Sequence, residues 1–136
     1  MSVEASIHAA LEAHLRAFAE PRQIRVARQG FAFDPPRDAA YLRVSFLPNR
    51  TERLFINTPQ HRRPGIFQVS VMAPPGQGLF PFLAIASDVA AHFAMDRRLT
   101  SGGTTTRITA APSIAPPIVE AASIQIPVSI PFEALA

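Results

Sequence analysis

The stretch SIQIPVSIPFEALA, residues Ser123–Ala136, poses the main problem of this fold. Its apolar residues alternate from Ile124 to Phe132, as expected for a β-strand with one buried face. Pro127 and Pro131 interrupt the run, and proline cannot donate a hydrogen bond to a neighbouring strand. Because both prolines have the same parity, both missing donors fall on one side of the strand. We therefore predict an edge strand that packs its isoleucines inward and that proline protects from unwanted pairing.

The rest of the chain alternates between helical and strand patterns. We predict a helix from Val3 to Phe18, because apolar residues recur there at the spacing of one helical face and Ser2 can serve as its N-cap. We predict a second helix from Leu79 to Arg98, with Pro81 in its first turn and Arg97 in its last. Further strands are predicted at 23–28, 41–47, 53–56, 65–73 and 104–111, and exposed loops at 30–38 and 57–64. This order predicts an α+β fold in a single domain over 1–136, with two helices packed on a mostly antiparallel β-sheet.

Composition excludes several classes of protein. Of the 136 residues 48% are hydrophobic and 17% charged, which is typical of a folded globular protein. No apolar run approaches the roughly 20 residues that span a bilayer, so we expect no membrane segment. The absence of cysteine excludes disulfides, zinc–thiolate sites and cysteine nucleophiles. The first residues lack a basic n-region, so we expect no signal peptide and synthesis in the cytoplasm.

The basic residues do not point to nucleic acid. All 13 are arginine, the formal net charge is +3, and the arginines are spread along the chain. A nucleic-acid-binding protein would gather them on one face or helix, so we expect no specific nucleic-acid partner.

No motif predicts a catalytic residue, a metal ligand or a cofactor. Two acid–histidine–acid triplets have i, i+4, i+8 spacing, but such triplets are common on solvated helices. Gly76–Gly78 and Ser101–Thr104 read as turns, since the phosphate-loop signatures and any group to activate the serine are missing. An enzyme is therefore the weakest functional alternative. The triplets are Asp88, His92, Asp96, which we place on the solvated side of the second helix, and Glu4, His8, Glu12.

Four arginines cluster in sequence around the loop at 57–64. One interpretation is a solvated loop, and the other is a docking surface, where arginine is common because its planar fork pairs with carboxylates. As a partner interface, the candidate residues are Arg50, Arg53, Arg62 and Arg63.

Several segments together resemble the small tail-terminator, or tail-completion, proteins of bacteriophages and prophages. These segments are YLRVSFLPNRTERLF, RRPGIFQVSVMAPPGQG with the alanine-rich helix ending AAHF, and the close IQIPVSIPFEA. The resemblance covers the chain from the first helix to the final strand. An aromatic residue often precedes the last strand in relatives, whereas this chain has Ala121, Ala122 and Ser123 there.

The resemblance implies a structural role without enzymatic activity. Such proteins assemble into a ring, typically a hexamer, which caps the tail tube, ends its polymerisation and offers the surface that joins the head. The implied partners are further copies of the chain, the tail tube protein and a head–tail joining protein, and the implied location is the virion tail. The alternative is a binding module for a small molecule or nucleic acid.

Overall fold

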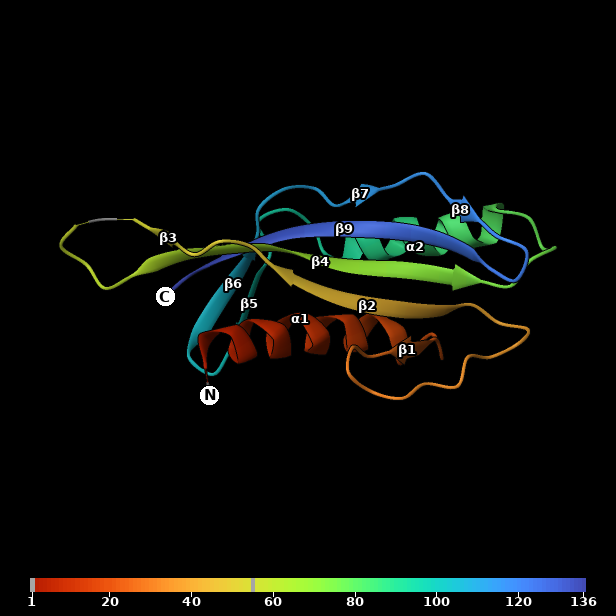
Figure 1. The fold of residues 1–136 in the computed structure, drawn as a ribbon, viewed down its shortest axis with the longest axis horizontal. Helices are drawn as coiled ribbons and strands as arrows, with labels where there is room; N and C mark the ends of the chain where they lie inside the picture. The colour runs from red at the N-terminus through yellow and green to blue at the C-terminus, as the bar shows by residue number, and fades with distance from the viewer. Residues whose placement is uncertain (1, 55) are drawn as a thin grey trace.

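The computed structural model describes residues 2–54 and 56–136, in which two helices pack on one sheet (Figure 1). This architecture confirms the predicted α+β class with a mostly antiparallel sheet. The helices are α1 (Val3–Ala19) and α2 (Phe80–His92). The strands are β1 (Arg25–Ala27), β2 (Tyr41–Pro48), β3 (Glu52–Arg53), β4 (His61–Ala73), β5 (Arg98–Ser101), β6 (Thr104–Ile108), β7 (Ser113–Ile114), β8 (Ile118–Val119) and β9 (Ile124–Leu135).

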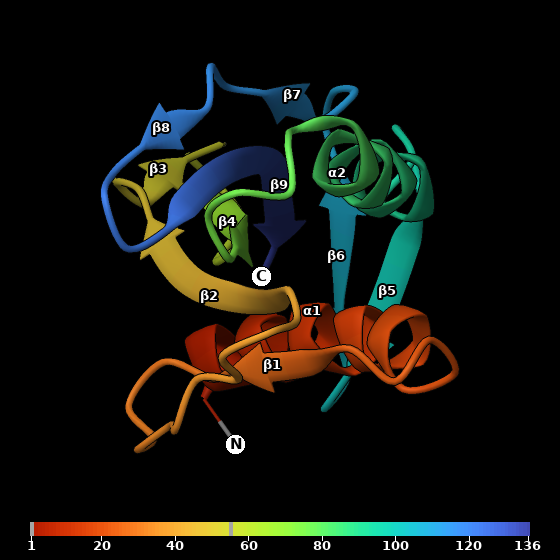
Figure 2. The same cartoon turned by 90° about the vertical axis from the view of Figure 1, so that its right-hand side faces the viewer.

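The sheet bends around the core, and the helices close its open side. Its main path runs β1-β2-β4-β9-β6-β5, with β3 added to β4, and with β7 and β8 added to β9. Only the short β1–β2 pair is parallel among the described strands. Figure 2 shows α1 along one side of the core and α2 along the other. In the part of the chain that the structure describes, no helix is long and apolar enough to cross a membrane.

Strand β9 lies in the middle of the sheet, so the predicted edge position is wrong. On one side it pairs with β4 in an unbroken register from Ile124 to Leu135. On its other side the pairing is broken into three short pieces. Pro127 and Pro131 fall in the two gaps between these pieces. The pieces are β8 at 124–125, β7 at 128–129 and β6 at 132–134.

The hydrogen bonds of the two prolines explain how a central strand tolerates them. The Pro127 carbonyl accepts from the amide of Ala115 at 2.9 Å, and the Pro131 carbonyl accepts from the amide of Thr109 at 3.1 Å. Both backbones therefore point to the broken side, as equal parity requires. The amides of Val128 and Ile130 have the opposite parity, so they face β4 and remain available to it. The prediction that both missing donors fall on one side of the strand was right. In the structure, however, the prolines lie at the gaps between successive partner strands and not at an edge of the sheet.

The second helix is shorter than predicted. It ends at His92, and Phe93 has left the helical region with φ −99° and ψ 54°. Asp96 then adopts a left-handed conformation with φ 69°, which turns the chain into β5. Arg97 therefore lies in a turn and Arg98 in a strand that the sequence did not predict, instead of the last helical turn.

The projecting end of the sheet also differs from the prediction. Strand β4 already begins at His61, so the predicted loop 57–64 is wrong over 61–64. The predicted strand 53–56 is limited to β3, which pairs with β4 and not back onto β2. Phe55 lies outside the described residues. β6 ends at Ile108, and only Arg25–Ala27 of the predicted first strand pairs.

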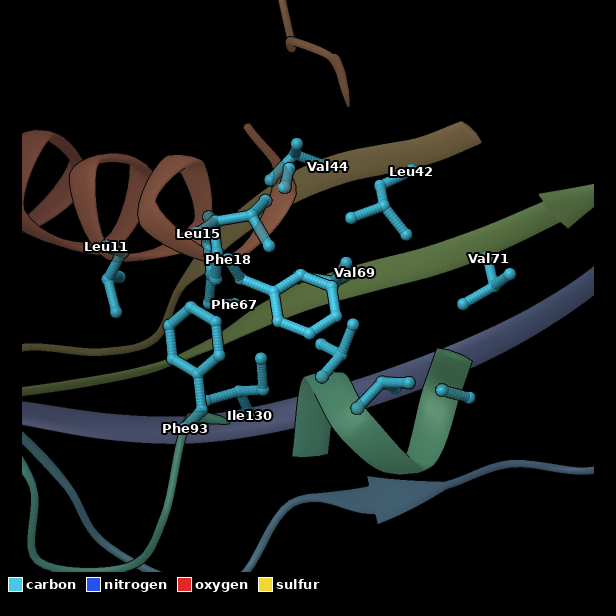
Figure 3. Close-up of a cluster of buried hydrophobic side chains, with 14 of the residues drawn as sticks. Leu11, Leu15, Phe18, Leu42, Val44, Phe67, Val69, Val71, Phe93 and Ile130 are labelled. Carbon is cyan, nitrogen blue, oxygen red and sulfur yellow. The ribbon is translucent and has the colours of Figure 1, made fainter. Parts of the chain in front are cut away.

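The core confirms the inward face of β9. Ile126, Val128 and Ile130 are fully buried, and Ile124 is 6% exposed. They meet the buried face of β4, and the aromatic rings of Phe67 and Phe93 lie 5.9 Å apart at the centre (Figure 3). The helix α1 contributes Leu11, Leu15 and Phe18 to the same cluster.

Gly65 marks the point where β4 leaves this core. A Cβ at this position would lie 2.5 Å from the Phe132 ring and 2.8 Å from the Leu47 carbonyl oxygen. Any side chain here would overlap both, so glycine allows β4 to pass close to its neighbours. Before it in the chain, the half-buried residues 61–64 continue the strand along β9.

Candidate functional site

The four arginines of the predicted interface lie on or beside one projecting ribbon. We call residues 49–54 and 56–60 the ribbon; it extends beyond the sheet between β2 and β4 (Figure 1). Arg50 and Arg53 are exposed on it, whereas Arg62 and Arg63 lie half-buried at its base in β4. The structure therefore divides the predicted cluster into two outer and two inner arginines.

The base of the ribbon is held by the carboxylate of Glu133 in β9. Arg62 Nε donates to Glu133 Oε2 at 2.6 Å, and Arg107 of β6 donates to Glu133 Oε1 at 2.8 Å. The Glu133 side chain is only 16% exposed. One carboxylate thus ties three neighbouring strands together.

These contacts extend into a chain of alternating charge. Arg62 also donates to Glu52 of β3 at 3.0 Å, and Arg107 also donates to Asp96 at 2.7 Å. We call the five residues Glu52, Arg62, Glu133, Arg107 and Asp96 the charged chain. The hydrogen bond from Arg107, aided by that from Arg62, holds the pKa of Glu133 below its usual value of 4.5 against the effect of partial burial.

Arg63 forms a second tie at the same place. Its guanidinium pairs with Glu4 at the start of α1, and its Nε donates to the Ala136 carbonyl at 3.3 Å. The outer arginines make local contacts: Arg53 donates to the Ile56 carbonyl at 3.1 Å, and the amide of Arg50 donates to Asn49 Oδ1 at 2.7 Å. Among the described residues neither Arg50 nor Arg53 has a carboxylate partner within 4.0 Å.

A pair of histidines joins the two helices. The rings of His14 in α1 and His92 in α2 stack with centroids 3.8 Å apart and an interplanar angle of 11°. Each Nε2 lies 2.7 Å from the backbone carbonyl of the other residue. A carbonyl oxygen only accepts, so both contacts require a proton on Nε2. Burial, opposed by the hydrogen bond to His92, lowers the pKa of His14 below its usual 6.5.

Within the described residues, the members of the two acid–histidine–acid triplets contact different partners and do not gather at one site. His92 faces α1 and not solvent, while Asp96 belongs to the charged chain. Glu4 pairs with Arg63, and His8 Nδ1 lies 3.6 Å from Glu12. The absence of a metal site stays a prediction.

Glu12 has a structural partner that the sequence did not show. Arg28 after β1 grips it with two hydrogen bonds, of 3.0 and 3.2 Å. Burial alone would raise the pKa of Glu12, but the hydrogen bond from Arg28 and the charge of His8 outweigh it and lower the pKa. The pair fastens β1 to α1.

Both glycine-containing segments that were predicted as turns, 76–78 and 101–104, form turns in the structure. Gly76 and Gly78 have φ of 89° and 76° just before α2. Gly102 and Gly103, with φ of 56° and 78°, form the two-residue turn of the β5–β6 hairpin, which favours residues that tolerate positive φ.

Sequence reasoning found Arg62 but missed the residues that bind it. Glu133 stands in an apolar alternating run, and Arg107 in a run of threonines, so neither carries a local signal. Their meeting depends on β4, β9 and β6 lying side by side, and Arg62 and Glu133 are separated by 71 positions in the chain.

Comparison with known proteins places this architecture in a family. A family model described as "Phage tail terminator protein" matches residues 6–132. A solved structure of a protein that is 30% identical superposes with a TM-score of 0.79, covering 94% of this chain and 92% of that chain. A search of curated proteins finds no match. The chain therefore belongs to the phage tail terminator protein family, and it is a structural component of a phage tail.

Proposed function

We propose that this protein forms a hexameric ring at the end of the tail tube of a phage or prophage. The ring caps the tube, ends its polymerisation and offers the surface that joins the head. Membership of the tail terminator family supports a role at the tail. The further partners would be the tail tube protein and a head–tail joining protein.

The observation that carries the proposal is the projecting ribbon. It extends from the sheet on a base fixed by Glu133, while its outer arginines, Arg50 and Arg53, are exposed and without carboxylate partners among the described residues. A rigidly based, basic projection suits a contact with an acidic surface of another subunit. We propose the ribbon as the surface that meets the tail tube, with Arg62 and Arg63 acting from its base.

The test is tube capping by purified protein. Tubes polymerised from the tail tube protein encoded beside this chain should stop growing when it is added, and electron microscopy should show rings at tube ends. The variant Arg50→Glu/Arg53→Glu should fold normally, because both side chains are exposed, yet cap tubes at least tenfold less effectively.

Arg97→Glu is the control for charge reversal as such, since it makes one Arg→Glu change at an exposed site after α2, away from the ribbon. It should cap like the parent protein. Tubes that keep growing in the presence of the parent protein would contradict the proposed function. Full capping by the ribbon variant would contradict only the assignment of the ribbon.

A further inference from the structure

The arginines of this chain are absent from one side of the molecule. Residues 64–96 and 108–136 contain no arginine or lysine. These segments supply α2, β7 and β8, which lie together on one side, whereas α1, β1 and the loop after β1 lie on the opposite side in both views (Figures 1 and 2). We call the first side the arginine-free face and the second the arginine face.

Two carboxylates of the arginine-free face have no ionic partner in the fold. Asp96 and Glu133 are engaged in the charged chain, but Asp88 of α2 and Glu120 after β8 are exposed. Within residues 2–54 and 56–136, neither of these two has a cation within 4.0 Å. This face is therefore acidic.

The arginine-free face also exposes large apolar side chains. Phe80, the first residue of α2, is 85% exposed, and Val119 of β8 is 67% exposed. Exposed aromatic side chains of this size are typical anchors of protein interfaces. Ile114 and Ile118 add to the same surface with 40% and 45% exposure.

The arginine face carries a groove between α1 and β1. Its volume is about 410 Å³, and its apolar lining comes from both elements. Glu12 and Arg28 at its rim neutralise one another, while Arg16 and Glu20 remain at the rim. The apolar lining residues are Leu15, Ala19, Ile24 and Val26.

Around the groove, three arginines without an ionic partner among the described residues outnumber one such carboxylate, Glu20, which leaves a net positive charge. Arg16, Arg22 and Arg25 are exposed, and no described carboxylate lies within 4.0 Å of them. The guanidinium carbons of Arg22 and Arg25 lie 4.0 and 4.7 Å from the ring centroids of Phe18 and Phe33, which holds these two arginines in place.

We infer that these two faces bind each other in neighbouring copies of the chain: Phe80 of one copy enters the α1–β1 groove of the next, and Asp88 and Glu120 approach Arg16, Arg22 and Arg25. The inference rests on the proposed ring and names its contact surfaces. The groove is large enough for one phenyl ring, and the charges that flank anchor and groove have opposite sign. Two different patches that meet head to tail can close into a ring.

Charge exchange between the faces gives a sharp test. Variant A carries Arg16→Glu and Arg25→Glu, and variant B carries Asp88→Arg and Glu120→Arg. Each variant alone presents like charges on both faces and should stay monomeric in sedimentation velocity at concentrations where the parent protein forms rings. An equimolar mixture should assemble again, because A and B can alternate around a ring with an even number of subunits.

The anchor is tested separately. Phe80→Ala should weaken self-association roughly tenfold or more, the cost expected for an interface anchor. Its circular dichroism should match that of the parent protein, because the side chain lies outside the core. Val3→Ala shortens a half-buried side chain in the first turn of α1, which does not line the groove, and is the control for small changes in stability.

The outcomes separate this inference from the proposed function. Recovery of rings only in the mixture supports it. If variant A, variant B and Phe80→Ala all form rings as well as the parent protein does, the proposed contact is wrong while the proposed ring stands. The contact is also wrong if A and B each fail to form rings alone and do not recover when mixed. A parent protein that forms no ring, even at tube ends, would overturn the proposed ring and this contact together.

Discussion

Two of the polar joints in this molecule differ in the protonation state that they favour. The charged chain joins strands and depends on an ionised Glu133 between two arginines. The stacked pair of His14 and His92 joins the helices and favours a neutral His14, whose pKa is lowered by burial. The comparison shows that one fold can be stabilised both by hydrogen bonds to a charged group and by hydrogen bonds from an uncharged one. Acid weakens each joint, but for a different reason and over a different pH range.

The largest effect is expected from reversing the charge at the centre of the first joint. Glu133→Lys places a third cation between Arg62 and Arg107 where the side chain is only 16% exposed. We expect a loss of about 3 kcal/mol in the free energy of unfolding, measured by urea denaturation at pH 7.5. Glu133→Gln, which keeps the shape and removes the charge, should lose less. Equal stability of Glu133→Lys and the parent would show that the charged chain does not support the strands.

A smaller effect separates the joints by pH. Because the pKa of His14 is lowered in the fold, the unfolded chain takes up the proton first, so stability is complete above about 6.5 and falls as the pH decreases below it. Because the pKa of Glu133 is also lowered, its contribution is complete above about 4.5 and is lost as the pH falls through the folded value.

His14→Gln should remove the first of these two losses. Glutamine can still donate to the His92 carbonyl but does not titrate, so stability between pH 5 and 7 should vary less by roughly 1 kcal/mol. Ala13→Gln, which places the same side chain at an exposed position of α1 and removes no titratable group, is the control and should keep the pH dependence of the parent. Urea denaturation across pH 4 to 8 measures both, and an unchanged slope in His14→Gln would contradict the joint.

Salt should give the smallest effect and sharpen the comparison further. The charged joint is partly exposed and is screened by ions, whereas His14, whose pKa is lowered, is uncharged at pH 7.5 and its contacts are not screened. Raising NaCl from 0.05 to 0.5 M should reduce the stability difference between the parent and Glu133→Gln by about 0.5 kcal/mol. The difference between the parent and His14→Gln should stay constant. A salt effect of similar size on both differences would remove the distinction.

How far the sequence predicts this fold depends on the range of the contacts. Local patterns were sufficient for α1 with its Ser2 cap, for the buried face of β9 and for the one-sided placement of its prolines. The position of β9 in the sheet was not predictable locally, because its partner β4 lies far away in the chain and nothing in an alternating strand names its neighbour.

The candidate site shows the same limit. Residues 61–64 were predicted as a loop because the segment is polar and contains prolines, yet they form the start of β4, where the strand pairs with β9 and Arg62 binds Glu133. His92 read as a solvated position of α2, but it meets His14 across 78 positions of the chain. Each missed contact joins charged or polar residues whose spacing carries no periodic signal.

The central place of β9 also sets the order in which a growing chain can fold on the ribosome. β4 is complete at Ala73, but its long partner begins only at Ile124. Until residues 124–135 have been made, β4 presents an open hydrogen-bonding edge and a bare apolar face, which favours association with other unfinished chains. Pairing across such a distance is slow. Prematurely terminated chains that lack β9 should therefore aggregate, and the sheet should be completed only after β9 has been made.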